Sequence, residues 1–333
     1  ENLKAACDVL NGGGVTDQME ITTVKYPKDY TYELDYQDIK GQKLAKRAAE
    51  VAVAGNHNML MIGPPGAGKT MIAKRIPTIL PPLTKEESME LTKLYSIVGG
   101  LNANRPLILE RPFREVHHTA TKSALIGGGL IPRPGEISLA DKGVLFLDEI
   151  AEFQKPVLEM LRQPLEEHFI KIIRNRGVYH FPAEFLLVAA MNPCPCGNYP
   201  NLNKCLCTST QIQAYLSKIS QPLLDRIDIC VEAERVAYED LQGAREESSK
   251  DIRERVIMAR ERQKERYKGE SITTNSQLNA EKIKQYCILG NEEEKMMRQA
   301  FDKLNLTARM YHKILCVART IADLAGEEKI SLS

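Results

Sequence analysis

The sequence contains no apolar run long enough to cross a membrane, since no stretch reaches the ~18 residues that a membrane helix needs. The first ten residues, ENLKAACDVL, also lack the basic and apolar segments of a signal peptide. Internal repeats and low-complexity tracts are missing as well. We therefore expect a cytoplasmic protein that does not contact a membrane.

The chain also has almost no net charge. Its 45 basic and 44 acidic side chains leave a formal charge of +1, so it lacks the overall basicity that is typical of nucleic-acid-binding proteins. Any contact with nucleic acid must then be local. Hydrophobic residues make up 43% and charged residues 27% of the chain, which excludes a disordered protein, a coiled coil and a disulfide-held mini-protein.

Cysteine, by contrast, is abundant, and four of the eight cysteines lie close together. Cys194, Cys196, Cys205 and Cys207 form the pattern CPC-x₈-CLC. Four thiolates can complete a tetrahedral structural zinc site, and such a metal would hold a loop that has few apolar residues to bury. We expect zinc here, with a redox pair, an iron–sulfur centre and chance clustering as the alternatives.

The segment GPPGAGKT, residues 63–70, follows a short apolar run and precedes a helical pattern. Strand, loop and helix in this order predict a phosphate-binding loop. Gly63 and Gly68 would let the backbone turn tightly toward the phosphates of ATP, Lys69 would reach the β and γ phosphates, and Thr70 would bind Mg²⁺. The expected phosphate-binding residues are Gly63, Pro64, Pro65, Gly66, Ala67, Gly68, Lys69 and Thr70.

Two further apolar runs, residues 143–147 and 185–191, resemble central parallel strands that are covered on both faces. Each ends in polar residues, which in an open α/β sheet lie beside the ligand. Asp148 would bind Mg²⁺, and Glu149 would polarise the attacking water. Asn192 follows the second run. A pair of solvated acidic residues that cap a helix is the alternative for Asp148 and Glu149.

The remainder of the chain predicts a helical domain. No strand pattern persists after about residue 236, and helical patterns cover residues 251–267, 280–286, 292–304 and 307–326. We divide the chain into residues 1–35, the tail of an N-terminal domain with a linker, residues 36–236, a P-loop core with the four-cysteine insert, and residues 237–333, a helical lid.

The order of GPPGAGKT, LFLDEI, LLVAAMN and LLDRID resembles an AAA+ ATPase, and more narrowly the magnesium-chelatase-like YifB/ComM family. Longer matches to that family include GGGLIPRPGEISLADKGVLFLDEI, LLVAAMNPCPCG and LTARMYHKILCVARTIADLAG. The resemblance implies an α/β fold, a three-layer αβα sandwich with a parallel sheet, followed by an all-helical lid. It also implies an N-terminal domain of Lon-like fold; because the chain starts without methionine, we expect that only the end of that domain is present.

The same resemblance implies roles that spacing alone does not give. Asn192 matches the sensor-1 residue that orients the attacking water, and Arg226 in LLDRID matches an arginine finger. Arg309 matches a sensor-2 arginine that reaches back to the phosphates, while Ile39 and Gly41 match residues that line the adenine pocket. For each arginine the alternative is a surface ion pair worth ~0–1 kcal/mol.

A β-hairpin is predicted in HFIKIIRNRGVYHFPAEF, where alternating apolar residues flank NRG. The resemblance implies that such a hairpin lines the pore of a ring. Lys171, Arg174 and Arg176 could bind phosphates there without reading bases. The insert GGGLIPRPG, with Arg133, is interpreted as a second pore loop. Ordinary solvated charges on the outer face of a hairpin are the alternative.

An arginine finger given to a neighbouring subunit predicts a ring, and the family implies a homo-hexamer. The leading hypothesis is therefore an AAA+ ATPase that uses ATP and Mg²⁺, with structural Zn²⁺, to remodel or translocate on single-stranded or branched DNA. One alternative is a chelatase-type motor subunit that drives a protein partner. Another is a protein remodeller like the transcription activators, although their GAFTGA loop is absent.

Overall fold

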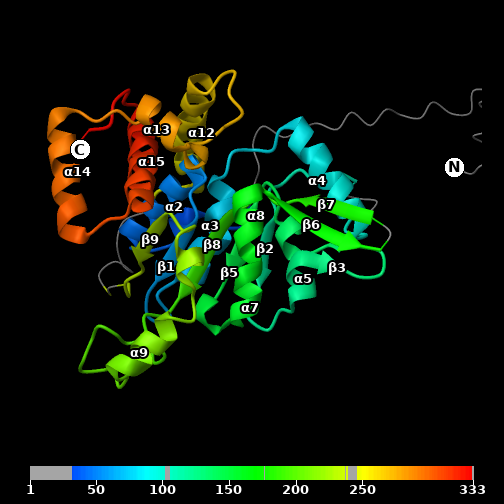
Figure 1. Cartoon of the computed structure of the whole chain (residues 1–333), viewed down its shortest axis with the longest axis horizontal. Helices are drawn as coiled ribbons and strands as arrows, with labels where there is room; N and C mark the ends of the chain where they lie inside the picture. The colour runs from blue at the N-terminus through cyan, green and yellow to red at the C-terminus, as the bar shows by residue number, and fades with distance from the viewer. Residues whose placement is uncertain (1–31, 102–105, 176, 237, 239–245, 332–333) are drawn as a thin grey trace, which may run out of the picture. The chain divides into compact units, whose positions relative to one another are not determined.

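The computed structural model describes residues 32–101, 106–175, 177–236, 238 and 246–331. Arg176, one of the predicted DNA-contacting residues, and residues 1–31 of the predicted N-terminal segment lie outside them. The described residues all belong to one of the two units into which the chain divides, Thr31–Ser333. Their arrangement is drawn in Figure 1.

A five-stranded parallel sheet forms the centre of this unit (Figure 1). Its strands lie in the order β2-β5-β8-β1-β9, and all four neighbouring pairs are parallel. The two apolar runs that predicted central strands form β5 and β8, so that prediction is confirmed. The strands are β1 (Met59–Ile62), β2 (Phe113–Val116), β5 (Val144–Leu147), β8 (Leu186–Met191) and β9 (Ile229–Glu232).

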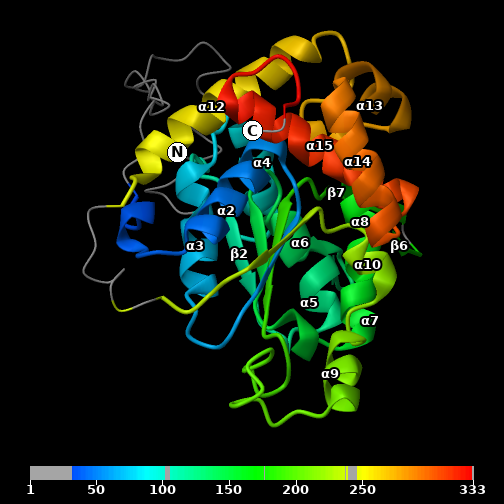
Figure 2. The ribbon, with the colours of Figure 1, turned by 90° about the vertical axis from the view of Figure 1, so that its left-hand side faces the viewer.

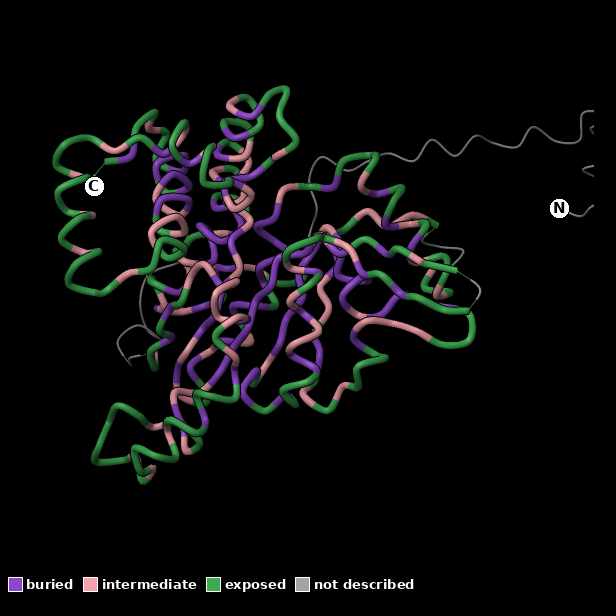
Figure 3. Tube along the Cα trace, viewed as in Figure 1, coloured by how far each residue is buried: buried purple, intermediate pink, exposed green. Residues whose placement is uncertain are grey.

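Both faces of the sheet are covered. Every residue of β5 and β8 is buried, and successive side chains along each strand enter different hydrophobic cores. In β8, for example, Leu187 packs into one core and Val188 into the other. A strand that is buried on both faces has to be apolar throughout rather than alternating, which is why the sequence shows continuous apolar runs. Figure 3 shows the buried sheet within a more exposed shell.

Helices on the two faces complete the three-layer αβα sandwich, as predicted. One face packs against α2 (Lys43–Gly55), α3 (Lys69–Ile79) and α12 (Ser249–Arg266). The other face packs against helices that lie between α3 and β9 in the chain. These are α4 (Lys85–Ile97), α5 (Lys122–Ile126), α6 (Glu136–Leu139), α7 (Lys155–Leu158), α8 (Arg162–Glu167), α9 (Ser209–Leu216) and α10 (Gln221–Leu224). Single turns of 3-10 helix are η1 (Tyr36–Asp38), η2 (Ile150–Glu152), η3 (Glu159–Leu161) and η4 (Asn275–Gln277).

Two antiparallel hairpins lie outside the main sheet. The predicted hairpin is confirmed as β6 (Phe169–Arg174) and β7 (Gly177–Pro182). The glycine-rich insert forms a smaller pair, β3 (Gly127–Gly128) and β4 (Arg133–Pro134). The Arg174 guanidinium donates to the Gly129 carbonyl at 3.5 Å, so the two hairpins contact each other.

The C-terminal third is helical, as predicted, and consists of α12, α13 (Ala280–Tyr286), α14 (Asn291–Leu304) and α15 (Ala308–Ala325). Thr307 caps α15 by accepting a hydrogen bond from the N–H of Met310 at 3.3 Å. Gly326 ends the helix with a φ of +82°. Helix α14 has no buried residue. Among the described residues, no helix has the length and apolar character that crossing a membrane requires.

A buried polar network joins the C-terminal helices to the core. Asp323 on α15 is fully buried and accepts a hydrogen bond from the Asn275 amide at 2.9 Å. Arg319, which is 2% exposed, pairs with Asp323 at 3.1 Å. One turn away, the Thr320 hydroxyl lies 2.8 Å from Nε2 of His57, which follows α2. Because buried polar groups are costly unless they are paired, this network fixes how α15 lies against α2.

Asp141 is a buried carboxyl where the first residues of β5 and β8 meet. It is 1% exposed, and its Oδ1 accepts a hydrogen bond from the Glu184 N–H at 2.7 Å. Its Oδ2 has no hydrogen-bond partner among the described residues. Burial raises the pKa of Asp141 to about 6, although the Glu184 amide and the Lys142 ammonium lower it. The folded chain therefore favours the protonated carboxyl.

The raised pKa predicts a pH-dependent stability. The favourable contribution of protonated Asp141 is complete below its ordinary pKa of 3.8 and is lost as the pH rises through about 6. Replacing Asp141 with Asn removes the charge and keeps the acceptor oxygen. We expect Asp141→Asn to raise the free energy of unfolding by about 1–3 kcal/mol near pH 8, and the gain to shrink toward about pH 5. Urea titrations at several pH values measure this gain in the free energy of unfolding, with Asp302→Asn at an exposed position as the control. A gain that is independent of pH would contradict the prediction.

Candidate nucleotide-binding site

The predicted phosphate-binding loop leaves the carboxyl end of β1 and leads into α3. It borders a cavity of about 380 Å³ at the carboxyl edge of the sheet. Side chains from the ends of β5 and β8 complete the lining, so the structure brings together segments that are far apart in the sequence. The lining residues are Pro65, Gly66, Ala67, Gly68, Lys69, Thr70, Met71, Asp148, Glu149, Met191 and Asn192.

The glycines of the loop serve two different purposes. Gly66 and Gly68 adopt φ angles of +78° and +87°, a left-handed conformation that glycine reaches without strain. Gly63 was expected to supply a tight turn, but it is not among the residues with positive φ. A Cβ at Gly63 would lie 2.1 Å from the Ala233 carbonyl oxygen. Glycine is needed there because the chain leaving β9 passes directly against the loop.

Lys69 is held among oxygen atoms at the centre of the cavity. Its ammonium donates to the Gly63 carbonyl at 2.6 Å and to the Asn192 side-chain oxygen at 3.2 Å. Burial lowers the pKa of Lys69, while attraction to Asp148 and Glu149 raises it. The lysine and the sensor-1 candidate thus meet in one site. Phosphate oxygens could replace these acceptors without leaving the ammonium unpaired.

The two acidic residues after β5 also line the cavity. The Thr70 hydroxyl donates to Oδ2 of Asp148 at 2.8 Å, so the two oxygens predicted to bind Mg²⁺ are already adjacent. Hydroxyl and carboxylate oxygens are the ligands that Mg²⁺ prefers. Glu149 has a left-handed backbone, with φ of +51°, and its side chain is half exposed.

His118 lies beside Glu149, which the sequence did not indicate. Its Nδ1 is 3.8 Å from Oε2 of Glu149, and its ring contacts the rings of His117 and Phe153. A strand order that places β2 next to β5 is what brings His118 to Glu149.

The two residues expected at the adenine pocket lie close to the loop but do not line the cavity. Ile39 is 3% exposed and packs in the core. Gly41 donates its N–H to the Glu246 carboxylate at 3.1 Å. The next residue, Gln42, was not predicted, yet its amide donates to the Ala67 carbonyl at 2.7 Å. Gln42 therefore connects this segment to the phosphate-binding loop.

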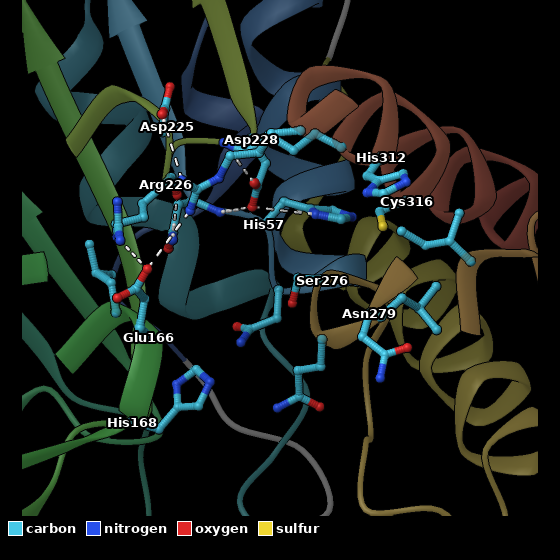
Figure 4. Close-up of a pocket in the computed structure, with 18 of the residues that line it drawn as sticks. His57, Glu166, His168, Asp225, Arg226, Asp228, Ser276, Asn279, His312 and Cys316 are labelled. Atoms are coloured by element: carbon cyan, nitrogen blue, oxygen red, sulfur yellow. Dashed lines mark hydrogen bonds and ion pairs between the residues drawn. The ribbon is translucent and has the colours of Figure 1, made fainter. Parts of the chain in front are cut away.

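Arg226 and Arg309 lie together in a different cavity, of about 470 Å³, between the core and the C-terminal helices (Figure 4). Arg226 pairs with Glu166. Arg309 lies 3.6 Å from Asp225 and 3.8 Å from Glu166. Neither arginine borders the cavity at the phosphate-binding loop. The expected reach of Arg309 to the phosphates of its own chain is therefore not seen in this structure.

The four cysteines after Asn192 converge. Their sulfur atoms all lie within 4.8 Å of one another, and Cys194 is 3.4 Å from Cys196 and 3.8 Å from Cys205. A tetrahedral zinc site with bonds of about 2.3 Å has sulfurs about 3.8 Å apart. The geometry fits four thiolates around one metal ion.

The basic residues predicted to contact DNA lie on the two hairpins. Lys171, Arg174 and Arg133 are exposed. Arg174 bridges the hairpins through the Gly129 carbonyl, so part of its role is structural. At the tip of the smaller hairpin, Leu130 is 90% and Ile131 is 74% exposed. The two hairpins thus present both charged and apolar side chains on one side of the core.

Comparison with known proteins agrees with this architecture. The profile of the family described as magnesium chelatase, subunit ChlI, matches residues 35–241, and the profile of its C-terminal region matches residues 246–333. Competence protein ComM of Haemophilus influenzae is 46% identical over 299 residues, which are 89% of this chain and 58% of that protein. The uncharacterized protein YifB of Salmonella typhimurium is 40% identical over 333 residues, 99% of this chain and 64% of that protein.

A second YifB, from Escherichia coli, is 40% identical over 336 residues, again 99% of this chain and 64% of the relative. The chain therefore spans about three fifths of the length of the curated relatives that it matches. The two profiles together cover the sheet, the phosphate-binding loop and the C-terminal helices.

The close approach at Gly63 predicts a position-specific cost. In Gly63→Ala the new methyl would meet the Ala233 carbonyl at 2.1 Å, whereas Gly66→Ala meets no atom within 4 Å and suffers only its left-handed φ. We expect Gly63→Ala to lower the free energy of unfolding by roughly 3 kcal/mol or more and Gly66→Ala by about 1–2 kcal/mol. Thermal and urea unfolding measure both. The reverse order would show that β9 does not constrain the loop.

Proposed function

The chain belongs to the magnesium chelatase subunit ChlI family of AAA+ proteins, and from this we propose that it hydrolyses ATP at the cavity beside the phosphate-binding loop. The convergence of Lys69, Thr70, Asp148, Glu149 and Asn192 on that cavity carries the proposal. The proposed domains are a P-loop core at residues 36–236 and a helical lid at residues 237–333. A cytoplasmic location is part of the same proposal.

The chemistry follows from the positions of these residues. The loop N–H groups and Lys69 would bind the phosphates, and Thr70 and Asp148 would hold Mg²⁺, which would supply positive charge against the phosphate oxygens. Glu149 polarises the attacking water and Asn192 orients it. The adenine end lies toward Gly41 and Ile39. The site then contains every element that phosphoryl transfer requires except an arginine.

We propose that the missing arginine comes from a neighbouring subunit of a ring, a homo-hexamer as in the family. Arg226 and Arg309 share one cavity with the carboxylates of Glu166 and Asp225. Since neither arginine borders its own chain's nucleotide cavity, both can serve the nucleotide of the next subunit. This revises the expectation that Arg309 acts within its own chain.

Mixing two inactive variants tests the shared site. Arg226→Ala alone should bind ATP but hydrolyse it about 10³-fold or more slowly, and Lys69→Ala alone should not bind it. In mixed rings, an intact loop from the first variant meets Arg226 from the second, so we expect hydrolysis to return in proportion to such interfaces. Steady-state ATPase assays across mixing ratios measure this. A mixture as inactive as its components would place Arg226 in its own chain's site.

We further propose that the ring remodels or translocates on DNA. Exposed Lys171, Arg174 and Arg133 on adjacent hairpins support phosphate contacts, and Arg176 belongs to the same predicted set. Similarity to a competence protein agrees with a role on DNA. The family name supports the main alternative, a chelatase-type motor that drives a protein partner; the transcription-activator-like remodeller has no comparable support.

DNA-stimulated ATPase activity separates these possibilities. We expect single-stranded or branched DNA to stimulate the ATPase, and the stimulation to fall steeply with added salt because phosphate contacts release counterions. Lys171→Ala combined with Arg133→Ala should reduce the stimulation more than the basal rate. Lys268→Ala, at a lysine that is 79% exposed on the C-terminal region, is the control. Indifference to single-stranded, duplex and branched DNA alike would favour the partner-driven motor.

The cysteine cluster completes the proposal. We assign it one structural Zn²⁺, held by Cys194, Cys196, Cys205 and Cys207, because the sulfur separations suit a tetrahedral ion. With four protein sulfurs bound, no coordination position remains for water, so the metal has no part in hydrolysis itself.

A further inference from the structure

We propose that the cysteine loop, residues 194–208, is a metal-braced support for the nucleotide site, which it contacts at Pro65 of the phosphate-binding loop and to which the chain connects it directly at Asn192. The proposal rests on the zinc and nucleotide sites proposed above and adds a physical connection between them. It makes the affinity for ATP depend on a metal that never touches the nucleotide.

The first contact is between the backbone of Gly197 and the ring of Pro65. The cysteine loop turns back at Gly197, whose φ is +75° and whose N–H donates to the Cys194 carbonyl at 2.9 Å. A Cβ at Gly197 would lie 2.4 Å from Cδ of Pro65. The cysteine loop therefore packs so closely against the phosphate-binding loop that only glycine fits at position 197. Pro65 also lines the nucleotide cavity.

The second contact is at Asn192, which lies two residues before Cys194. Tyr215 on α9, the helix that follows the cysteine loop, is 4% exposed. Tyr215 packs into the core beyond the far end of the cysteine loop, and only Pro193 separates Asn192 from the first cysteine. The side chain of Asn192 in turn accepts from Lys69 at 3.2 Å.

The loop has little else to stabilise it. Cys194 is buried, but Tyr199 is 43%, Leu202 is 81% and Leu206 is 91% exposed. Figures 1 and 2 show the segment beside α9 extending away from the sheet, and Figure 3 shows it as largely exposed. A loop without a hydrophobic interior depends on its cross-links for a fixed shape. The four sulfurs are the groups that can supply them, so loss of the metal should free both contacts.

Two glycine substitutions test the contact at Pro65. Gly197→Ala and Gly269→Ala both place alanine at positive φ, +75° and +87°, but the new methyl at Gly269 meets nothing within 4 Å. We expect Gly197→Ala to retain one zinc per chain and to weaken the binding of a fluorescent ATP analogue about ten- to hundredfold, because small displacements at a binding loop are costly. Gly269→Ala should change the affinity less than about twofold. Equal affinities in the two variants would overturn the proposal.

Removal of the metal tests the same connection from the other side. In Cys205→Ser combined with Cys207→Ser, we expect elemental analysis to show no zinc, circular dichroism to show unchanged helix content, and affinity for the ATP analogue to fall as in Gly197→Ala. A zinc-free variant that binds the analogue like the parent chain would overturn the proposal. A parent chain that binds the analogue but carries no zinc would instead refute the zinc site, and one that binds no analogue would refute the nucleotide site.

Discussion

The register of the parallel strands around β1 determines the geometry of the nucleotide site. Ile62, the last residue of β1, lies opposite Met191 of β8 on one side and Glu232 of β9 on the other. The three strands therefore end at one level, and the residues that follow them emerge together. A slip of one residue would turn every strand side chain to the opposite core, so burial on both faces holds this register firmly.

Motifs that are local in the sequence were predicted well, and contacts between distant segments were not. The phosphate-binding loop, the buried strands β5 and β8, the hairpin and the helix limits at Thr307 and Gly326 follow from turn, cap and hydrophobic patterns. The need for glycine at position 63 does not follow from such patterns. Its neighbour Ala233 is 170 residues away in the sequence and is brought close only by the strand order of the sheet. The contacts of Gln42 and His118 were not predicted for the same reason, because their partners are distant in the sequence.

The placement of Arg309 shows most clearly what could not be predicted from the sequence. The Thr307 cap predicts that Arg309 lies at the start of α15. The direction in which its side chain points depends on how α15 packs against the core. That orientation is set by the buried contacts of Asp323 and Thr320, which connect α15 to η4 and to His57. Thr320 and Asp323 lie in the stretch LTARMYHKILCVARTIADLAG that resembles the family, but their pairing becomes visible only when the helices are packed. The network thus fixes the orientation of the helix that carries Arg309.

The ion pairs that hold Arg309 are suited to exchange. Arg309 and Glu166 are each about half exposed, and the atoms that join them are 3.8 Å apart; such pairs contribute ~0–1 kcal/mol. Triphosphate oxygens carry more charge and are geometrically matched to guanidinium groups, so a nucleotide presented by a neighbouring subunit would compete well against Glu166 and Asp225. In the proposed ring, these carboxylates would hold Arg309 in position until a neighbouring subunit binds. Subunit assembly and nucleotide binding should therefore be thermodynamically linked, because each supplies what the other site lacks.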